Sequence, residues 1–256
     1  MRALLSVYDK TGVVELAKGL HELGWELVSS GGTAAAIAAA GVPVVDVADY
    51  TGSPIMLGHR VVTLHPRIHG GILADRDDPE HRADLEANDI EPIDLVVGNL
   101  YPFRAEPSVE NIDIGGPTMV RAAAKNHAHV GVVVDPDDYD IILVELTNAG
   151  HLSLGTRRQL ARKAFAHTAA YDAAIVSWMD DTDEIKDAED PLPVSLHLAL
   201  ERVQDLRYGE NPHQVGARYR YADGAGWWDE AIQHHGKDMS YLNLFDTEAA
   251  WRLVFS

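Results

Sequence analysis

The sequence predicts an α/β fold with a mainly parallel sheet, followed by a second, incomplete α+β segment. Short apolar runs alternate with segments in which apolar residues have helical spacing, which is typical of a parallel sheet with crossover helices. An acidic run without periodicity, residues 180–191, interrupts this pattern and indicates a solvated linker. The stretch after it holds roughly 50 residues, too few for a normal independent core.

The first three strands are expected at 3–7, 25–28 and 42–47, with helices at 13–23 and 34–40 between them. Ser30, Gly31, Gly32 and Thr33 are expected to form a tight polar loop before the second helix. This loop is a candidate phosphate site, because glycines let the backbone approach while hydroxyl and N–H groups donate hydrogen bonds. Small polar residues also fill ordinary strand-to-helix turns, so the pattern alone leaves both interpretations open.

Periodicity fails over residues 51–73, and we expect an irregular segment there. Long irregular segments in compact domains are usually functional or mobile. His65 and His69 have the spacing of a helical metal pair, but Pro66 lies between them and no acid is near. We therefore expect no metal ion.

The chain continues with a surface helix at 78–88, a strand at 93–98, a strand at 130–134, and helices at 136–148 and 154–179. Asn99 and Tyr101 directly follow the strand at 93–98. Ligands of an open parallel sheet gather beyond the carboxyl ends of its strands, so both residues are candidates for binding. Tyr101 could equally be an amphipathic lid residue without a chemical role.

The most informative stretch runs from residue 111 to 127. A helix is expected to begin at Pro117, a residue favoured in the first turn, and it carries Arg121 and Lys125 four residues apart on one face. Asp113 precedes it. A loop acid, the N–H groups of a helix start and two cations can together hold an anion and move protons. Alternatively, Asp113 caps the helix and Lys125 complements the helix dipole.

The composition excludes several classes of function. The chain has no cysteine, which excludes disulfides, thiolate metal sites and a cysteine nucleophile. Its net charge of −19 argues against binding of nucleic acid or of anionic membranes, although a few local cations are enough for a phosphate-bearing substrate. No apolar run of about 18 residues and no signal-peptide pattern are present, so a cytoplasmic location is expected.

Several motifs, in a fixed order, carry a resemblance to a known family. Those in the first part are S-V-Y-D-K-T-G, S-S-G-G-T-A, G-H-R-V-V-T-L-H-P-R-I-H-G-G-I-L, N-L-Y-P-F and I-D-I-G-G-P-T-M-V-R-A-A-A-K-N-H. The motifs L-R-Y-G-E-N-P-H-Q and H-G-K-D-M-S-Y-L-N follow the acidic run. The chain closely resembles the bifunctional purine-biosynthesis enzymes that pair an inosine-monophosphate (IMP) cyclohydrolase with a phosphoribosylaminoimidazolecarboxamide formyltransferase.

The resemblance implies a methylglyoxal-synthase-like, three-layer cyclohydrolase domain at 1–180, an acidic linker at 181–200, and a truncated, cytidine-deaminase-like start of the formyltransferase at 201–256. The first domain would close the purine ring of 5-formamidoimidazole-4-carboxamide ribonucleotide to IMP with loss of water. Formyltransferase activity is expected to be absent, because the catalytic Lys-His pair of the family would lie beyond Ser256.

The resemblance also implies the site residues. Lys125 would be the proton donor or acceptor, Asp113 would orient or deprotonate the attacking amide, and Tyr101 would assist. The nucleotide would be held by Tyr8, Asp9, Lys10, Ser30, Gly31, Gly32, Thr33, Arg60, Val61, Val62, Thr63, Gly98, Asn99, Asp113 and Ile114. In the formyltransferase segment, Arg207 and Tyr208 match nucleotide-contacting positions.

Cofactors and partners follow from the same resemblance. The cyclohydrolase would need neither a cofactor nor a metal, and 10-formyltetrahydrofolate is the co-substrate of the missing formyltransferase domain. The expected partner is a small nucleotide, with no nucleic acid and no membrane. Family members are homodimers, largely through the second domain, so this shorter chain is compatible with a monomer or a dimer.

The chain departs from the family at three positions. The family usually has lysine in place of Val62, glycine in place of His59 and often serine in place of Tyr8. The valine removes a cation that would contact an anionic ligand. Substrate binding is therefore expected to be weaker than in lysine-bearing relatives, unless His59 or Arg67 compensates.

Two other functions stay open for a fold of this type. One is a regulatory module, since the fold also resembles the allosteric ligand-binding domain of carbamoyl-phosphate synthetases. The other is a methylglyoxal-synthase-like phosphate lyase, which shares the glycine-threonine loop. Asp113 with Lys125 favours an enzyme over the first, and the N-L-Y-P-F and R-A-A-A-K-N-H motifs favour the cyclohydrolase over the second.

Overall fold

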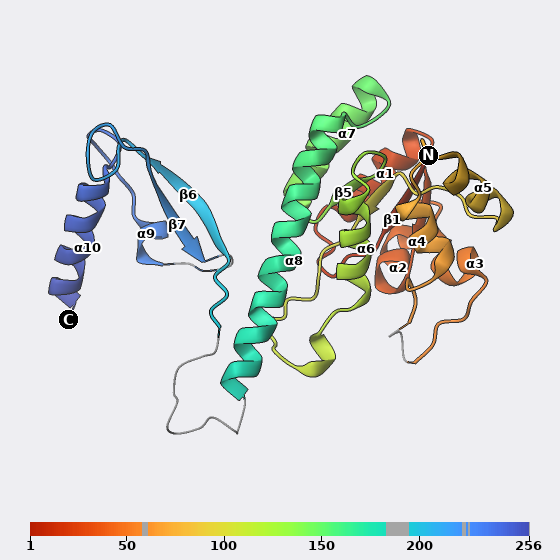
Figure 1. Cartoon of the computed structure of the whole chain (residues 1–256), viewed down its shortest axis with the longest axis horizontal. Helices are drawn as coiled ribbons and strands as arrows, with labels where there is room; N and C mark the ends of the chain where they lie inside the picture. The colour runs from red at the N-terminus through yellow and green to blue at the C-terminus, as the bar shows by residue number, and fades with distance from the viewer. Residues whose placement is uncertain (58–60, 183–194, 222–223, 225, 256) are drawn as a thin grey trace. The chain divides into compact units, whose positions relative to one another are not determined.

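The structure is a computed structural model, and it describes residues 1–57, 61–182, 195–221, 224 and 226–255 (Figure 1). The chain forms two compact units, Met1–Thr182 and Asp183–Ser256. Among the described residues, no helix is both long enough and apolar enough to cross a membrane.

The first unit is built on a five-stranded sheet with the order β3-β2-β1-β4-β5. Its strands are β1 Arg2–Leu5, β2 Glu26–Ser29, β3 Val45–Asp46, β4 Leu95–Val97 and β5 Gly131–Val133. Every neighbouring pair is parallel, and Leu4 of β1 lies opposite Val28 of β2 and Val96 of β4. The predicted α/β fold with a mainly parallel sheet is therefore confirmed.

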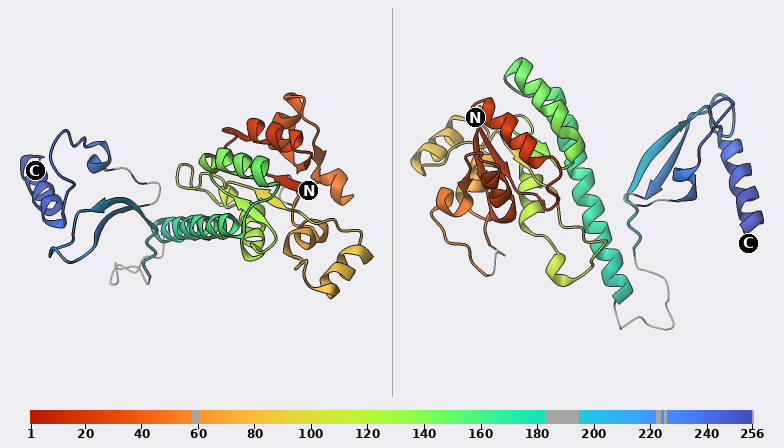
Figure 2. Two further views of the ribbon diagram at one scale, coloured as in Figure 1. Left: turned by 90° about the horizontal axis from the view of Figure 1, so that it is seen from above. Right: turned by 180° about the vertical axis from the view of Figure 1, so that it is seen from behind.

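Helices cover both faces of this sheet. They are α1 Val13–Glu22, α2 Gly31–Ala39, α3 Val47–Thr51, α4 Pro66–Leu73, α5 Pro79–Ala87, α6 Gly115–Lys125, α7 Tyr139–Ala149 and α8 Leu154–Thr182, with 3-10 turns η1 Val109–Asn111 and η2 Pro136–Asp138. Helix α1 packs against α2 and α7, whereas α6 packs against α4 and α8. The two groups lie on opposite sides of the sheet, giving three layers (Figure 2). Right-handed crossover connections explain this arrangement. The strands after β1 and the strand after β4 extend the sheet in opposite directions, so their connecting helices lie on opposite faces.

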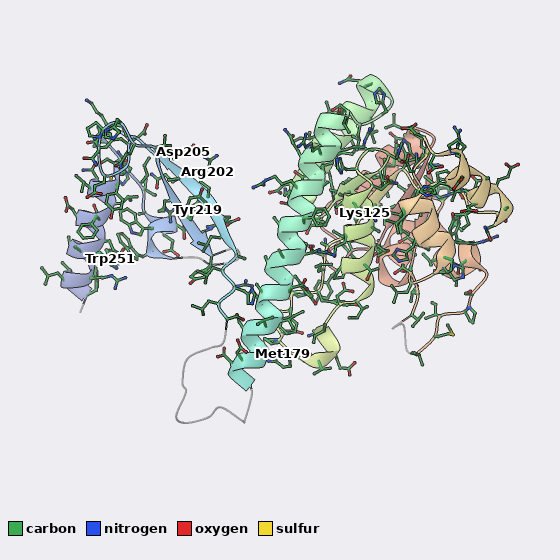
Figure 3. The ribbon with its side chains drawn as sticks, viewed as in Figure 1. Lys125, Met179, Arg202, Asp205, Tyr219 and Trp251 are labelled. Carbon is green, nitrogen blue, oxygen red and sulfur yellow. The ribbon has the colours of Figure 1, made fainter. Side chains whose placement is uncertain are left out.

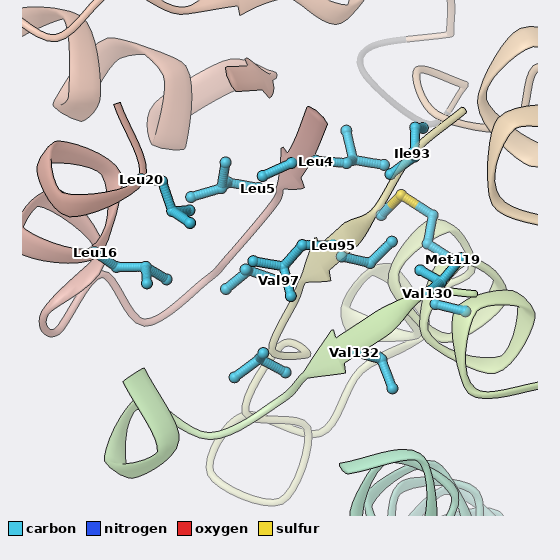
Figure 4. Close-up of a cluster of buried hydrophobic side chains, with 14 of the residues drawn as sticks. Leu4, Leu5, Leu16, Leu20, Ile93, Leu95, Val97, Met119, Val130 and Val132 are labelled. Carbon is cyan, nitrogen blue, oxygen red and sulfur yellow. The ribbon is translucent and has the colours of Figure 1, made fainter. Parts of the chain in front are cut away.

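The core of the first unit lies on both faces of the central strands (Figure 4). Leu4 and Leu5 are adjacent in β1, so they point to opposite faces of the sheet, and both are buried. Leu16 and Leu20 of α1 lie on the side of Leu5, and Met119 of α6 lies on the other side. Burial of each such side chain stabilises the fold by about 1.5–3 kcal/mol. Strands that are buried on both faces explain the uninterrupted apolar runs in the sequence.

Two elements near the second strand differ from the expectation. Ser29 ends β2 and Gly31 begins α2, so the expected polar loop is largely the first turn of a helix. Gly31 has a φ of +54°, which glycine adopts without strain. The third strand is short, because Asp46 caps α3 by accepting a hydrogen bond from the Ala48 N–H at 2.8 Å.

Prolines mark two further differences. The segment expected to be irregular contains α4, which begins at Pro66, and the Nδ1 of His65 caps it by accepting from the Arg67 N–H at 3.1 Å. Helix α6 begins at Gly115, ahead of Pro117. Proline is favoured in a first helical turn, so Pro66 signals the start of a helix and not an interruption.

The expected acidic linker falls mostly outside the described residues. Helix α8 continues to Thr182, so the first acidic residues after 179 are helical. Residues 183–194 are not described.

The second unit is a small α+β arrangement. Strands β6 Leu200–Leu206 and β7 Gly216–Tyr221 pair antiparallel, and they are followed by α9 Trp227–Glu230 and α10 Tyr241–Phe255. Figure 3 marks Arg202 and Asp205 on β6, whose side chains form an ion pair at 3.2 Å. Among the described residues of this unit, only Gly209 and Ser240 are buried. The described part therefore has no apolar core of its own.

The glycine pair in α4 provides a test of the packing. A Cβ atom on Gly71 would lie 2.6 Å from the Glu91 carbonyl oxygen, whereas a Cβ on Gly70 would meet only the flexible end of Ile90 at 3.1 Å. Gly71→Ala should lower the free energy of unfolding by about 1–3 kcal/mol, the usual cost of overpacking. Urea unfolding followed by circular dichroism measures this.

Gly70→Ala is the matched control, because it adds the same methyl group one residue away on the same helix. Its cost should be small, since alanine is the better helix former by about 1 kcal/mol. Equal losses in the two variants would contradict the close contact at Gly71.

Candidate active site

The sheet has a switch point between β1 and β4. From β1 the chain proceeds to β2 and β3 on one side, and it then returns to form β4 and β5 on the other. Loops that leave the carboxyl ends of two such strands diverge, and the space between them is where ligands bind in open α/β sheets. The loop after β1 holds Tyr8, Asp9 and Lys10, and the loop after β4 holds Gly98, Asn99 and Tyr101.

The side chain of Asn99 joins these two loops. Its Oδ1 accepts hydrogen bonds from the backbone N–H of Tyr8 at 2.6 Å and of Asp9 at 3.0 Å. Its Nδ2 donates to the Asp9 carbonyl oxygen at 2.9 Å. Both acceptor positions of the amide and one donor position are thus used within the protein. Asn99 is therefore first of all a clamp, with one N–H left for a ligand.

The Lys10 ammonium group lies at the start of α2. It donates to the Tyr8 carbonyl oxygen at 3.2 Å, and a Cβ on Gly32 would lie 3.5 Å from its Nζ. Ser30, at the N-cap of α2, makes no capping hydrogen bond with its side chain. A cation beside the N–H groups of a helix start is suited to bind a phosphate. Lys10, predicted to hold the nucleotide, therefore lies beside residues 30–32 of the predicted phosphate site.

Thr33 and Asp9 support this region. The Thr33 hydroxyl is buried, accepts from the Val7 N–H at 3.1 Å and donates to the Val7 carbonyl oxygen at 3.0 Å. It fixes α2 to the segment after β1, and its O–H donor is used there. The Thr11 hydroxyl and N–H donate to Asp9, which lowers the pKa of that carboxyl.

Two tyrosine rings border the same edge. Tyr8 and Tyr101 meet edge to face, with ring centroids 5.3 Å apart and an interplanar angle of 77°. Both are about half exposed. Exposed aromatic faces are suited to contact a planar base, so the tyrosine in place of the usual serine adds apolar surface here.

Asp113 lies at the start of α6. Its Oδ1 accepts a hydrogen bond from the Gly116 N–H at 2.9 Å. A Cβ on Gly116 would collide with the Asp113 carboxylate and would lie 2.8 Å from Leu100, so the carboxylate lies against the β4 loop. Burial raises the pKa of Asp113, although the N–H groups of Gly116 and Gly115 lower it. A carboxyl with a raised pKa is suited to accept a proton near neutral pH.

The segment 61–63 reaches the same helix start. Thr63 is buried, and a Cβ on Gly115 would lie 3.1 Å from its hydroxyl oxygen. Val61 forms an isolated antiparallel bridge with Met56. Ile114 is the exposed N-cap residue of α6. Arg60 lies outside the described residues, as does His59.

Val62 lies between the site segment and the apolar core. Its side chain packs against the apolar core and is only partly exposed. Arg67 does not compensate for it, because its guanidinium donates to the Asp89 carboxylate at 2.6 Å and to the Tyr50 carbonyl oxygen at 3.1 Å. The weaker binding expected from the valine therefore stays a prediction, without compensation from Arg67.

Lys125 is not near Asp113 within one chain. Helix α6 separates them by its full length, about 15 Å at 1.5 Å per residue. The helix leads from the carboxyl end of β4 to the amino end of β5, so Lys125 lies at the opposite edge of the sheet (Figure 3). Arg121 stacks over the Phe165 ring of α8 at 5.5 Å. The expected arrangement of an acid beside two cations is therefore wrong for a single chain.

Arg207 and Tyr208 belong to the second unit. The Arg207 guanidinium lies 4.9 Å from the Tyr208 ring centroid, and hydrogen bonds from Ser240 and Arg207 lower the pKa of Tyr208. Arg207 also lines an open hollow of about 500 Å³ together with Lys237 and Asp246. The two residues predicted for a nucleotide are therefore adjacent to one another.

One potential metal-binding group was not expected from the sequence. Asp75, Asp77 and His129 bring one ligand atom each to within 4.8 Å of one another. The group is mostly exposed, and a hydrogen bond between the Nε2 of His129 and the Asp75 carboxylate at 3.0 Å accounts for its geometry. His65 acts as a helix cap, and burial lowers the pKa of His69.

Comparisons with known proteins match both parts of the chain. A family model described as the MGS-like domain matches residues 12–125, and one described as the AICARFT/IMPCHase bienzyme matches residues 123–256. The chain belongs to the AICARFT/IMPCHase bienzyme family. The resemblance read from the motifs, and the methylglyoxal-synthase-like fold that it implied, are thereby confirmed.

Two similar proteins extend this result. The bifunctional purine biosynthesis protein PurH of Synechococcus sp. (strain WH7803) is 58% identical over 265 residues, which cover 98% of this chain and 50% of that protein. This chain thus spans about half the length of that relative. A solved structure described as the crystal structure of ForH is 40% identical, with a TM-score of 0.63, and the match covers 69% of this chain and 97% of that chain.

Lys10 offers the sharpest test of the anion site in this family member. Lys10→Met keeps the length of the side chain but removes the charge beside α2. The dissociation constant of a phosphate-bearing ligand such as IMP should rise by about 10-fold to 100-fold, the value of one charge-assisted hydrogen bond. Isothermal titration calorimetry measures it.

Lys18→Met is the control, because it removes the same charge from an exposed position in the middle of α1. Its effect on binding should be less than about twofold at physiological salt, because distant exposed charges are screened. If both variants bind IMP as the wild type does, the phosphate does not lie at the start of α2.

Proposed function

We propose that the first unit is an IMP cyclohydrolase, which closes the purine ring of 5-formamidoimidazole-4-carboxamide ribonucleotide and releases water. One observation carries the proposal. Asp113, a half-buried carboxyl with a raised pKa, shares the carboxyl edge of the sheet with the cationic helix start formed by Lys10 and α2. A ribonucleotide carries a phosphate, which matches the cationic helix start, and a base on which protons must move, which matches the carboxyl group. Membership of the bienzyme family supports the proposal.

The substrate is bound from both ends in this proposal. Its phosphate accepts hydrogen bonds from Lys10 and from the first turn of α2, while its base lies beside the rings of Tyr8 and Tyr101. The remaining N–H of Asn99 is available to the substrate between these points. Holding both ends brings the carboxamide nitrogen toward the formyl carbon, and such positioning alone can supply several kcal/mol of the barrier.

Three protons leave their original atoms during the reaction. The carboxamide nitrogen attacks the formyl carbon, a C–N bond forms, and the nitrogen gives one proton to the Asp113 carboxylate. The formyl oxygen takes up a proton and becomes a hydroxyl group, and we assign the Tyr101 hydroxyl as the donor. The C–O bond then breaks, and the hydroxyl group leaves as water with the proton of the former formamide nitrogen. The proton held by Asp113 returns through solvent to the Tyr101 oxygen, so both groups are restored. General acid–base catalysis of this kind contributes about 10²-fold to 10⁴-fold.

We also propose that this step uses no cofactor and no metal. Addition to the formyl group and loss of water leave every oxidation state unchanged, so no redox partner is required. A folate would serve only the formyl transfer of the longer relatives. The regulatory module and the phosphate lyase are not favoured, because the matching family is the bienzyme. Incubation with the formylated ribonucleotide, followed by chromatography for IMP, distinguishes the cyclohydrolase from both of these.

Asp113→Asn tests the proposed proton acceptor. Asparagine keeps an oxygen that can accept from the Gly116 N–H, but it cannot take a proton from the substrate. Turnover should fall at least about 100-fold, while the Michaelis constant changes little. Formation of IMP is followed by its ultraviolet absorbance, and the exposed Asp140→Asn on α7 is the control that removes an equivalent charge. Near-normal turnover in Asp113→Asn would refute the assignment.

The raised pKa of Asp113 gives a second readout of the same variant. A carboxyl whose pKa is higher in the folded than in the unfolded state stabilises the fold at low pH, and this contribution is lost as the pH rises through the folded pKa. Asparagine is neutral at every pH, so Asp113→Asn should raise the melting temperature at pH 7, where the wild-type carboxyl is ionised. The difference from the wild type should disappear as the pH falls below the ordinary value of 3.8.

Lys125 gives the third test, because one chain cannot bring it to Asp113. If it transfers a proton in the reaction, a second copy must supply it. In that case Lys125→Ala should lose at least about 100-fold in turnover. Mixing it with Asp113→Asn should then restore roughly a quarter of the activity, since random dimers contain one complete site in every second dimer.

The mixture is compared with each variant alone at the same total concentration. Full activity of Lys125→Ala alone would remove this lysine from the mechanism. Loss of activity without recovery in mixtures shown to contain mixed dimers would mean that no shared site forms.

A further inference from the structure

A small aromatic cluster lies apart from the main core, next to Asp113. Its buried members are Leu100, Phe103 and Tyr171, and Ile112, Ala174, Ile175 and Trp178 pack against them. The Phe103 ring meets the Tyr171 ring at 6.0 Å and the Trp178 ring at 5.5 Å, both edge to face. The cluster therefore fixes the loop between β4 and α6 on the side of α8.

Within this cluster, the hydroxyl of Tyr171 holds the backbone on both sides of Ile112. It accepts a hydrogen bond from the Asp113 N–H at 2.8 Å and donates one to the Asn111 carbonyl oxygen at 2.7 Å. The residue is only 8% exposed, so its ring has little freedom to move. Asp113 is thus held at two points, by Tyr171 at its N–H and by Gly116 at its carboxylate.

Two other hydrogen bonds near Asp113 lie within the loop itself. The side chain of Asn111 donates to the Glu106 carbonyl oxygen at 2.7 Å, and the Ser108 hydroxyl accepts from the Asn111 N–H at 3.3 Å. Both bonds remain within the loop and do not fix it relative to the sheet. Tyr171 is carried by the 29-residue helix α8, which packs on α6 and β5. It is the residue that transmits the position of a rigid helix to the acid.

We propose that Tyr171 is a positioning residue for Asp113, whose hydroxyl sets the direction of the carboxylate toward the substrate. The inference rests on the proposed function, because it assigns Asp113 the proton transfer. Tyr171 itself does not touch the substrate. Burial raises its pKa, so it keeps the proton that it donates to Asn111 throughout the neutral range.

Tyr171→Phe tests the inference, since it removes only the hydroxyl and keeps the ring that packs on Phe103. Turnover should fall by about 10-fold to 100-fold, because a misplaced catalytic group costs that much, and the Michaelis constant should change less than about threefold. The pH at which turnover reaches half its maximum should decrease, because a released carboxylate becomes better solvated and its pKa moves toward the ordinary value.

Tyr50→Phe is the matched control. Tyr50 is another partly buried tyrosine whose hydroxyl donates to a backbone oxygen, that of Glu91, at 3.3 Å. The control should lower the melting temperature by a similar amount without moving turnover or its pH profile. Equal losses of turnover in both variants, with the pH profile unchanged, would mean that Tyr171 only stabilises the fold and would overturn the inference.

Two further measurements test the positioning role of Tyr171. The double variant Tyr171→Phe with Asp113→Asn should lose no more turnover than Asp113→Asn alone, and additive losses would overturn the inference. Carbon-13 NMR of the Asp113 carboxyl group should show a lower pKa in Tyr171→Phe than in the wild type. This titration needs no catalysis, so it tests Tyr171 even if the protein proves not to be a cyclohydrolase, and an unchanged Asp113 pKa would refute the positioning role.

Discussion

The amide of Asn99 is the interaction on which the candidate site depends. It joins the loops after β1 and β4 at the point where the sheet reverses direction. These hydrogen bonds also position the neighbouring residues. They hold the Tyr8 ring against the Tyr101 ring, and they place Lys10, which follows Asp9, at the start of α2. Each of the three hydrogen bonds contributes only about 1 kcal/mol, but together they fix two loops that would otherwise diverge. A single side chain therefore couples the start of α2 to the two tyrosine rings, the regions proposed for the phosphate and the base.

Helix α6 determines which residues share a site. Its start brings Asp113 to the carboxyl edge of the sheet, together with Thr63 and Leu100. Its end carries Lys125 to the amino edge. Asp113 and Lys125 belong to one continuous motif, yet the direction of a crossover helix between parallel strands separates them. Which residues share a site in one chain therefore depends on the direction of the helix between the strands, and not on the separation of the residues in the sequence.

Much of the fold could be predicted from the sequence, because buried parallel strands and amphipathic helices have distinct periods. The errors have physical reasons. Gly31 and Gly32 are poor helix formers, yet they occupy a first turn, where the backbone N–H groups need no intrahelical partner. The loop pattern could also suggest a phosphate site near Lys10. It could not reveal Tyr171, which is 58 residues away from Asp113 and belongs to an ordinary helical pattern. Contacts between distant elements have no local signal in one sequence.

The exposed apolar side chains of the second unit affect how unfolding of this chain would be observed. Leu253, Val254 and Phe255 are already largely in contact with water, so unfolding of this unit exposes little new apolar area and adds little to the heat-capacity change. Of the five tryptophans, however, Trp227, Trp228 and Trp251 lie in this unit. Calorimetry would therefore report mainly on the first unit, whereas tryptophan fluorescence would report largely on the second. If the two methods gave different unfolding midpoints, the units would be unfolding independently of one another. Such a difference would not indicate an intermediate in the folding of either unit.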